Sequence, residues 1–152
     1  MAYVKLDIKI LDSSLWVDRA QREIFITALL MAVPHETSEP LKQLCTRSLD
    51  ETGFVVPPGR YGFIKTAGVG IINRALLSEK EGFRALEKLA SPDPESQDPD
   101  WEGRRLVRVR GGYIVLNFDK YREKDHTATE RQRRYREKAR SGFRERKPPR
   151  QY

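Results

Sequence analysis

The residues of this chain with the clearest potential for chemistry are basic, and they occur in ordered groups. Lys80, Arg84 and Lys88 recur every four residues, a spacing that places side chains on one face of an α-helix. Four arginines then crowd into one β-prone stretch: Arg104, Arg105, Arg108 and Arg110. Rows of such cations suit contact with DNA phosphates, and a helical row can also reach base edges in a major groove. The alternative for the helical row is an ordinary solvated face, since Glu81 and Glu87 stand beside it.

A larger group of basic residues lies in the C-terminal tail. Residues 120–152 contain 13 Lys and Arg against 5 Asp and Glu, a net charge of +8, whereas residues 1–119 contain 16 against 17, a net charge of −1. A basic tail on a near-neutral body indicates a polyanionic partner, either nucleic acid or an acidic membrane surface. The tail residues that we predict to contact DNA are Arg131, Arg133, Arg134, Arg136, Lys138 and Arg140.

Catalytic chemistry has much weaker support in this sequence. It offers no nucleophile paired with a base, and Gly68-Val69-Gly70 lacks the rest of a phosphate-binding fingerprint. Asp93, Glu95 and Asp98 could hold a metal as in a nuclease, but they lie in a proline-rich loop of a kind that is usually solvated. We therefore expect a protein that is not an enzyme and that uses no cofactor and no metal.

The apolar residues place the chain among soluble, reduced proteins. Cys45 is the single cysteine, so no intrachain disulfide can form, and a half-buried thiol in a reducing cytoplasm is the simplest interpretation. The longest strongly apolar run, residues 24–33, is interrupted by Thr27 and falls well short of the roughly 20 residues of a spanning helix. We expect a cytoplasmic protein with no membrane partner.

The elements that must position the basic groups can be read in chain order. Residues 3–11 alternate between polar and apolar, which predicts a half-buried strand or an extended arm. Residues 18–32 have the periodicity of a helix, with Asp18 as its cap and Gln21 at capping-box spacing, and Val33-Pro34 ends it. We read His35, which follows, as a solvated loop residue.

The middle of the chain predicts short, irregular elements. Residues 41–49 are compatible with a short helical turn. Residues 52–64 contain two β-prone pieces separated by Pro57-Pro58-Gly59, which forces a turn. One of these pieces would supply the single strand that a winged helix inserts between its first and second helices.

The second half of the chain carries the most informative pattern. A helix is predicted over residues 69–77, with Ile72, Leu76 and Leu77 in the core. Ser78 and Glu81 then form a capping box for a helix over residues 79–90. The predicted buried face of this second helix consists of Phe83, Leu86, Leu89 and Ala90.

A loop and a hairpin follow these two helices. Trp101 is expected to pack its loop, residues 91–104, onto the domain. Residues 105–110 and 113–118 alternate around Gly111-Gly112, which predicts a tight hairpin. Its inward residues would be Leu106, Ile114, Leu116 and Phe118.

This order of elements predicts an α+β fold. Helix, turn, helix and hairpin make a winged helix-turn-helix of three helices and a small β-hairpin wing, with an N-terminal strand or arm and a basic C-terminal tail. The domain would span residues 1–119, with an insertion around 33–66, and the tail would span 120–152 and be partly helical or disordered. Thr127 and Glu130 repeat the capping spacing before a solvated basic helix over residues 130–140.

Residues 84–138 resemble the distinctive part of a family of phage and prophage winged-helix proteins, and residues 11–31 resemble the opening of such proteins. The motifs are S-P-D-P-E-S (91–96), E-G-R-R (102–105), G-G-Y (111–113), N-F-D-K-Y-R (117–122) and E-R-Q-R-R-Y-R (130–136). Related members resemble replisome organisers or replication initiation proteins. Residues 32–66 depart from the usual compact version, and the second domain with which initiators engage a helicase or its loader is not expected here.

The resemblance implies a duplex DNA-binding protein of phage or prophage origin that acts in replication initiation or its control. A transcriptional regulator is an alternative, and a winged-helix scaffold for protein interaction is another. The implied partner is double-stranded DNA. Phage or host replication proteins and a second copy of the chain in a homodimer are further partners that this interpretation leaves open.

Overall fold

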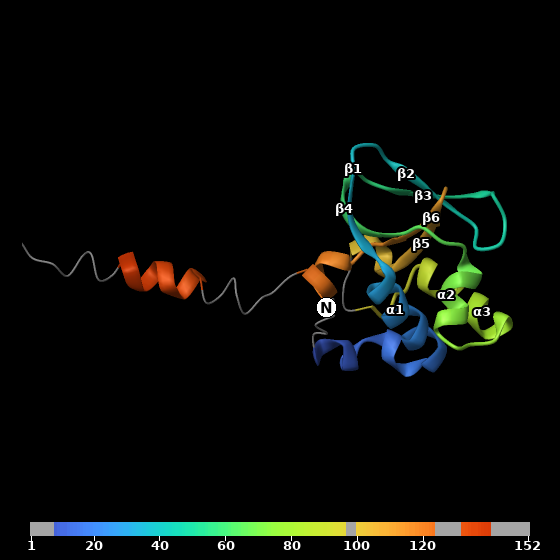
Figure 1. Ribbon diagram of the computed structural model, residues 1–152, viewed down its shortest axis with the longest axis horizontal. Helices are drawn as coiled ribbons and strands as arrows, with labels where there is room; N and C mark the ends of the chain where they lie inside the picture. Colours follow the sequence, from blue (N-terminus) through green and yellow to red (C-terminus); the bar gives the residue numbers. More distant parts are fainter. Residues whose placement is uncertain (1–7, 97–99, 124–131, 141–152) are drawn as a thin grey trace, which may run out of the picture.

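The computed structural model describes residues 8–96, 100–123 and 132–140. It is a mixed α+β structure in which α1, α2 and α3 gather on one side of a six-stranded antiparallel sheet (Figure 1). The elements run in the order η1 (Ile8–Asp12), η2 (Ser14–Val17), α1 (Arg19–Met31), β1 (Val33–Thr37), β2 (Leu41–Leu44), β3 (Glu51–Val56), β4 (Gly59–Ile64), α2 (Gly68–Arg74), α3 (Glu79–Ala90), η3 (Asp100–Gly103), β5 (Leu106–Val109), β6 (Gly112–Val115) and the π-helical turn η4 (Asp119–Glu123). Residues 132–140 are also helical.

The first helix begins and ends where its local sequence predicts. Asp18 Oδ1 accepts hydrogen bonds from the backbone nitrogens of Ala20 and Gln21, at 3.0 and 3.3 Å. The Gln21 amide also donates to Asp18 Oδ2 at 3.2 Å, so the cap satisfies donors that the first turn leaves unpaired. The helix ends at Met31, because the backbone is extended from Ala32 into the following Val33-Pro34.

The second and third helices follow one another closely in the chain, with α2 ending at Arg74 and α3 beginning at Glu79. Ser78 Oγ accepts from the backbone nitrogen of Glu81 at 3.3 Å and starts α3. A methyl group on Gly82 would collide with the side chain of Ile72, so glycine lets α3 approach α2 closely. Leu86 and Leu89 are fully buried between these helices and the sheet, as predicted.

One predicted core position of this region is wrong, and another is only partly buried. Leu76 is 92% exposed, because α2 ends at Arg74 and Leu76 turns the chain with a φ of +58°. Phe83 is only half-buried and lies at the edge of the core beside α2. The 3.6-residue spacing of apolar residues continues in the sequence past the end of α2, and for this reason Leu76 was predicted to be buried.

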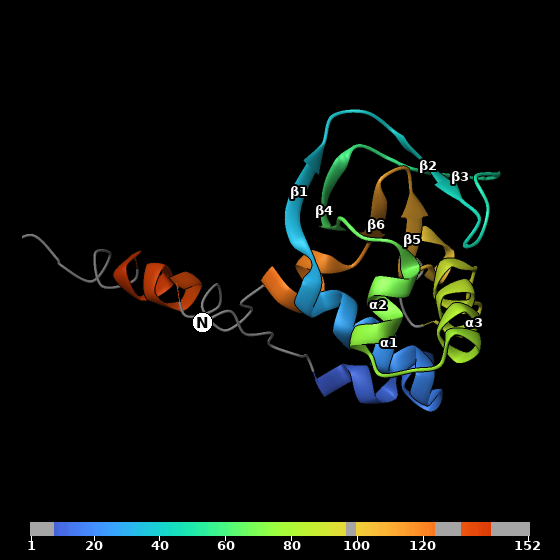
Figure 2. The same cartoon turned by 45° about the vertical axis from the view of Figure 1, so that its right-hand side comes forward.

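The sheet is larger than the small wing that the sequence predicts. Residues 33–44 and 51–64 form one long antiparallel ribbon, in which β1 pairs with β4 and β2 pairs with β3. The ribbon arches over the β5–β6 hairpin, and the strand order is β1-β4-β6-β5-β2-β3 (Figure 2). β4 pairs with β6 on one flank, and β2 reaches β5 on the other through Leu44 and Arg108.

Several predictions for the N-terminal half need correction. Residues 41–49 are not helical, since they hold β2 and the turn after it. The two β-prone pieces are both strands, and β3 pairs with β2 while β4 pairs with β1. His35 lies in β1 with its ring 5.3 Å from that of Phe63, and not in a loop. The expected strand over residues 3–11 is a 3₁₀ turn from Ile8 onward, and its earlier residues lie outside the described part.

The β5–β6 hairpin forms as predicted, with a turn displaced by one residue. Val109 pairs with Gly112, so the two turn residues are Arg110 and Gly111, and Gly111 takes the positive φ of +92°. Gly112 belongs to β6, where a side chain would collide with the carbonyl oxygen of Ile64. The four residues predicted to point inward are all buried: Leu106, Ile114, Leu116 and Phe118.

The hairpin separates two hydrophobic cores. Leu106, Tyr113 and Val115 pack with the helices, whereas Val107 and Ile114 pack with residues of the arched ribbon. The ribbon contributes Leu41, Phe54, Val56, Tyr61 and Phe63 to the second core, and the loop after α3 contributes Trp101. Trp101 therefore packs its loop onto the domain, as predicted.

We expect Leu86→Ala to lower the free energy of unfolding by about 2–5 kcal/mol, because the side chain is 1% exposed and its removal leaves a cavity. Leu76→Ala removes the same atoms at a 92% exposed position and should change the free energy of unfolding by no more than about 0.5 kcal/mol. Urea denaturation of both variants measures the difference. Equal losses would contradict this assignment of the core.

Candidate nucleic-acid interface

The most buried of the hairpin arginines joins three distant parts of the chain. Arg105 donates from Nη1 to Asp93 Oδ2 at 3.0 Å, and from Nη2 to Ser13 Oγ at 3.2 Å and Ser14 Oγ at 3.0 Å. Its side chain is 6% exposed. Arg105 therefore fastens the segment before α1 to the loop after α3, and it faces the protein interior instead of a ligand.

The electrostatics of Asp93 follow from this contact. Burial by itself would raise the pKa of the Asp93 carboxyl, but hydrogen bonds from Ser14 and Arg105 outweigh burial and hold that pKa below its usual value of 3.8. Asp93 is thus an anion that stabilises a buried cation. Within the part of the chain that the structure describes, no group of three potential metal ligands occurs, and Asp98, the third carboxylate of this loop, lies outside that part.

Arg104 and Arg108 also serve the fold. Nη1 of Arg104 donates to the carbonyl oxygen of Ala90 at 2.9 Å, and its guanidinium lies 4.4 Å from the ring centre of Phe54. Nη1 of Arg108 donates to the carbonyl oxygens of Cys45, Thr46 and Ser48 at 3.0–3.1 Å. Arg108 thereby holds the turn after β2 against the hairpin.

The predicted basic face of α3 is exposed, but its three members differ in their surroundings. Lys80 and Arg84 project from the side of α3 opposite its buried face. Lys88 Nζ lies 3.2 Å from Asp18 Oδ2, the carboxylate that caps α1. Burial would raise the pKa of Asp18, yet hydrogen bonds from Gln21 and Lys88 lower it below its usual value. Lys88 thus contributes to the junction between α1 and α3.

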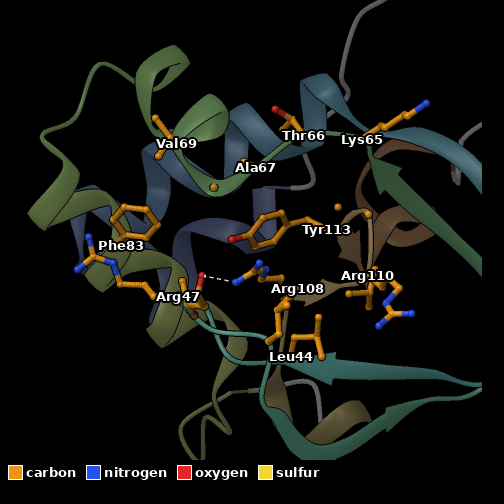
Figure 3. Close-up of a pocket in the computed structure, with 16 residues that line it drawn as sticks. Leu44, Arg47, Lys65, Thr66, Ala67, Val69, Phe83, Arg108, Arg110 and Tyr113 are labelled. Atoms are coloured by element: carbon orange, nitrogen blue, oxygen red, sulfur yellow. Dashed lines mark hydrogen bonds between the residues drawn. The ribbon is translucent and has the colours of Figure 1, made fainter.

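The structure brings together a different set of cations at the tip of the β5–β6 hairpin. A groove of about 500 Å³ lies between this tip, the turn after β2, the segment before α2 and the side of α3 (Figure 3). We call it the hairpin-tip groove, and its cations are Arg47, Lys65, Arg108 and Arg110. None of the described residues that line it is acidic. Two other hollows beside α1 and α3 are each lined by carboxylates, such as Asp18 and Asp93 respectively.

Aromatic side chains form the inner part of the hairpin-tip groove. The guanidinium of Arg47 lies 4.2 Å from the ring centre of Phe83. Tyr113 is paired with Arg108 across the hairpin, and its hydroxyl is directed toward Phe83 inside the groove (Figure 3). That hydroxyl is buried and has no hydrogen-bond partner in the described part of the chain. Burial raises the pKa of Tyr113, with a smaller opposing effect from Arg108, so the phenol stays protonated at neutral pH.

The sequence predictions identified only part of this groove. Arg108 and Arg110 were predicted from the hairpin, but Arg47 and Lys65 stand alone in the sequence and belong to no spacing pattern. They meet because β2 pairs with β5 and β4 pairs with β6. The sequence pattern placed Phe83 in the core and did not predict that its ring would also line a groove.

The cations of residues 132–140 do not line the hairpin-tip groove. Five of the predicted contact residues belong to the helix of residues 132–140 and are exposed: Arg133, Arg134, Arg136, Lys138 and Arg140. Arg133 makes an ion pair of 3.3 Å with Glu137 one turn later. Arg131 lies outside the described residues.

Comparisons with protein-family models, with curated proteins and with solved structures found no match to this chain. Within the described residues, no helix combines the length and the apolar character needed to cross a membrane.

We expect Asp93→Asn to lower stability at pH 7 by about 3 kcal/mol, because it leaves the cation of Arg105 buried without its counter-charge. The folded-state pKa of Asp93 is depressed, so its contribution is fully present above the unfolded pKa of about 4 and is lost as the pH falls through the lower folded value. Wild type should therefore lose stability more steeply than Asp93→Asn below about pH 5.

The exposed neighbour Glu95 supplies a control, since Glu95→Gln leaves the contact between Asp93 and Arg105 in place. Thermal melting of the three proteins between pH 2.5 and pH 7 measures both effects. Parallel curves for wild type and Asp93→Asn would contradict the assigned role of Asp93.

Proposed function

We propose that the protein binds duplex DNA on the face where the hairpin tip approaches α2 and α3. The observation that carries this proposal is the hairpin-tip groove, where four cations meet without a lining carboxylate on a body of net charge −1. In a near-neutral body, such a local excess of positive charge attracts a polyanion, and binding releases the counterions that the polyanion had condensed.

The arrangement of the elements supports a winged-helix interpretation of this face. α2, a tight turn and α3 are followed by the β5–β6 hairpin, and the strand before α2 pairs with the second hairpin strand. In that interpretation the six-stranded sheet is an enlarged wing. α3 would enter the major groove with Lys80 and Arg84, while Arg110 at the hairpin tip would contact the flanking backbone.

The proposed contacts differ from the full predicted set. Arg104, Arg105 and Arg108 are omitted because their guanidinium groups are committed within the fold. Lys88 is omitted because it pairs with Asp18. Arg47 and Lys65 are added because both are exposed at the groove. The basic residues of the tail would add affinity that does not depend on DNA sequence, and those within residues 132–140 carry their charge on an exposed helix.

The resemblance of residues 84–138 to phage and prophage proteins narrows the biological role. We propose replication initiation or its control as that role, with transcriptional regulation as the nearest variant, because both need a duplex reader. Phage or host replication proteins would then be partners of the DNA-bound protein.

A protein-interaction scaffold is the second candidate, and a specific feature favours it. Leu76 is 92% exposed and Val17 is 89% exposed, and Leu76 lines a hollow with Asp18, the residue next to Val17. Large apolar side chains on a surface are typical of docking sites when they are grouped. A scaffold of this kind would bind a partner protein and show no affinity of its body for duplex DNA.

We expect the triple variant Arg47→Gln, Lys65→Gln and Arg110→Gln to weaken duplex binding and to lower the log–log salt slope by about 2 to 3 units, since each lost phosphate contact contributes about 0.9. A matched triple variant of Arg19, Lys42 and Arg60 removes equal charge from exposed positions outside the groove. It should change the slope by less than about 1 unit. Fluorescence anisotropy over a salt series measures both, and equal effects would contradict a localised interface.

Removal of residues 124–152 should lower the salt slope by about 5 units, if half of its 11 basic residues contact phosphate. The truncation keeps Tyr121, whose ring packs edge-on against Phe25 at 5.4 Å and belongs to the core. Sequence preference, measured by selection from a random duplex pool, should be unchanged. A slope altered by less than about 1 unit would end the proposed role of the tail in DNA binding.

A further inference from the structure

The hairpin-tip groove contains two kinds of surface that meet in one small space. Its exposed cations, Arg47, Lys65 and Arg110, form a rim, whereas its wall is apolar and includes Phe83 and Val69. Figure 3 shows these side chains arranged around a common hollow, with Lys65 and Arg110 on the hairpin side and Phe83 on the side of α3. The volume of about 500 Å³ lies within the range of sites that enclose a small molecule, roughly 300–1,000 Å³.

The contact between Arg47 and Phe83 indicates what such a wall can accept. The guanidinium carbon of Arg47 lies over the ring of Phe83, 4.2 Å from its centre, so the face of this ring already accepts a planar cation. Nucleic-acid bases use aromatic faces in the same way, and stacking tolerates any base. Arg47 is exposed, so its side chain can leave the ring to a base and turn to the phosphate of the same nucleotide.

The buried hydroxyl of Tyr113 is the second, independent observation. Tyr113 is 3% exposed, and its hydroxyl has no hydrogen-bond partner among the described residues. It is directed into the hollow between Phe83 and Arg108 (Figure 3). A buried polar group without a partner is costly, and a ligand that supplies an acceptor at this point would remove that cost. The edge of a base carries such acceptors.

We propose that the hairpin-tip groove binds one unpaired nucleotide, with its base stacked on Phe83, its base edge hydrogen-bonded to Tyr113 and its phosphate on Arg47, Lys65 and Arg110. The nucleotide is either a free nucleoside phosphate or an unpaired unit of a DNA strand. The second source rests on the proposed DNA binding, and the first does not.

The test uses the full chain and three probes of defined structure: a blunt duplex, the same duplex with a one-nucleotide overhang of 2-aminopurine, and deoxyadenosine monophosphate. The wild-type protein should bind the overhang duplex about tenfold more tightly than the blunt one and quench the 2-aminopurine fluorescence. Equal affinities without quenching would overturn the proposal, unless the free monophosphate binds.

Two variants separate the proposed contacts from stability. Phe83→Leu should abolish the advantage of the overhang, and Tyr113→Phe should reduce it about fivefold. Both should leave affinity for the blunt duplex within about twofold, because that affinity comes from the outer cations. Tyr135→Phe, at an exposed position of the helix of residues 132–140, is the matched control and should change neither affinity. An unchanged overhang advantage in both groove variants, with unchanged melting temperatures, would overturn the assignment.

The remaining outcomes distinguish the source and the alternatives. Saturable binding of the monophosphate that is weakened by Tyr113→Phe supports a free nucleotide as the ligand. Binding of the overhang alone supports an unpaired strand unit. Overhang or monophosphate binding without blunt-duplex binding would contradict the proposed function and leave the nucleotide site standing. A poly-glutamate peptide can be tested as a competitor for the overhang duplex. If it displaces the duplex as well as the monophosphate does at equal concentration, the groove prefers an acidic peptide and the nucleotide proposal is overturned.

Discussion

Both faces of the β5–β6 hairpin are apolar, and burying both is the constraint on which the rest of the structure depends. Leu106 and Tyr113 on one face pack against α1, α2 and α3, whereas Val107 and Ile114 on the other need a separate cover. Burial of such side chains contributes about 1.5–3 kcal/mol each, so neither face can stay in water. The ribbon of residues 33–64 supplies the second cover. The apparent insertion is therefore a structural part of the domain.

The same arrangement creates the candidate interface. Near the hairpin tip, Arg110 is exposed and Arg108 binds the carbonyl oxygens of the turn after β2. That turn presents Arg47 beside Phe83, and the end of β4 presents Lys65. The cationic groove is thus a consequence of how the ribbon, the hairpin and the helices join. Its chemistry, a charged rim over an aromatic wall, suits a nucleic acid better than an uncharged ligand.

Local signals in the sequence predicted much of the fold, and long-range contacts account for what was missed. Asp18 and Ser78 cap their helices through bonds to neighbours within three residues, so α1 and α3 could be placed. The partners of Arg105 include Ser13, 92 positions earlier, and no local pattern reveals them. For the same reason the hairpin arginines were all predicted as ligand contacts, although three of them support the fold, and the meeting of Arg47 with Lys65 was not foreseen. The winged-helix interpretation and the DNA-binding role stay predictions.

Binding of duplex DNA at the hairpin-tip groove can be located by an amide chemical-shift titration of the isotopically labelled full chain with duplex DNA selected from a random pool. The largest shifts should fall at residues 46–49, 65–69, 80–84 and 110–112, which surround the hairpin-tip groove and the outer face of α3. The edge strand β3 should remain unperturbed. Shifts confined to residues 132–140, or spread evenly over the body with none at the groove, would contradict binding at the groove.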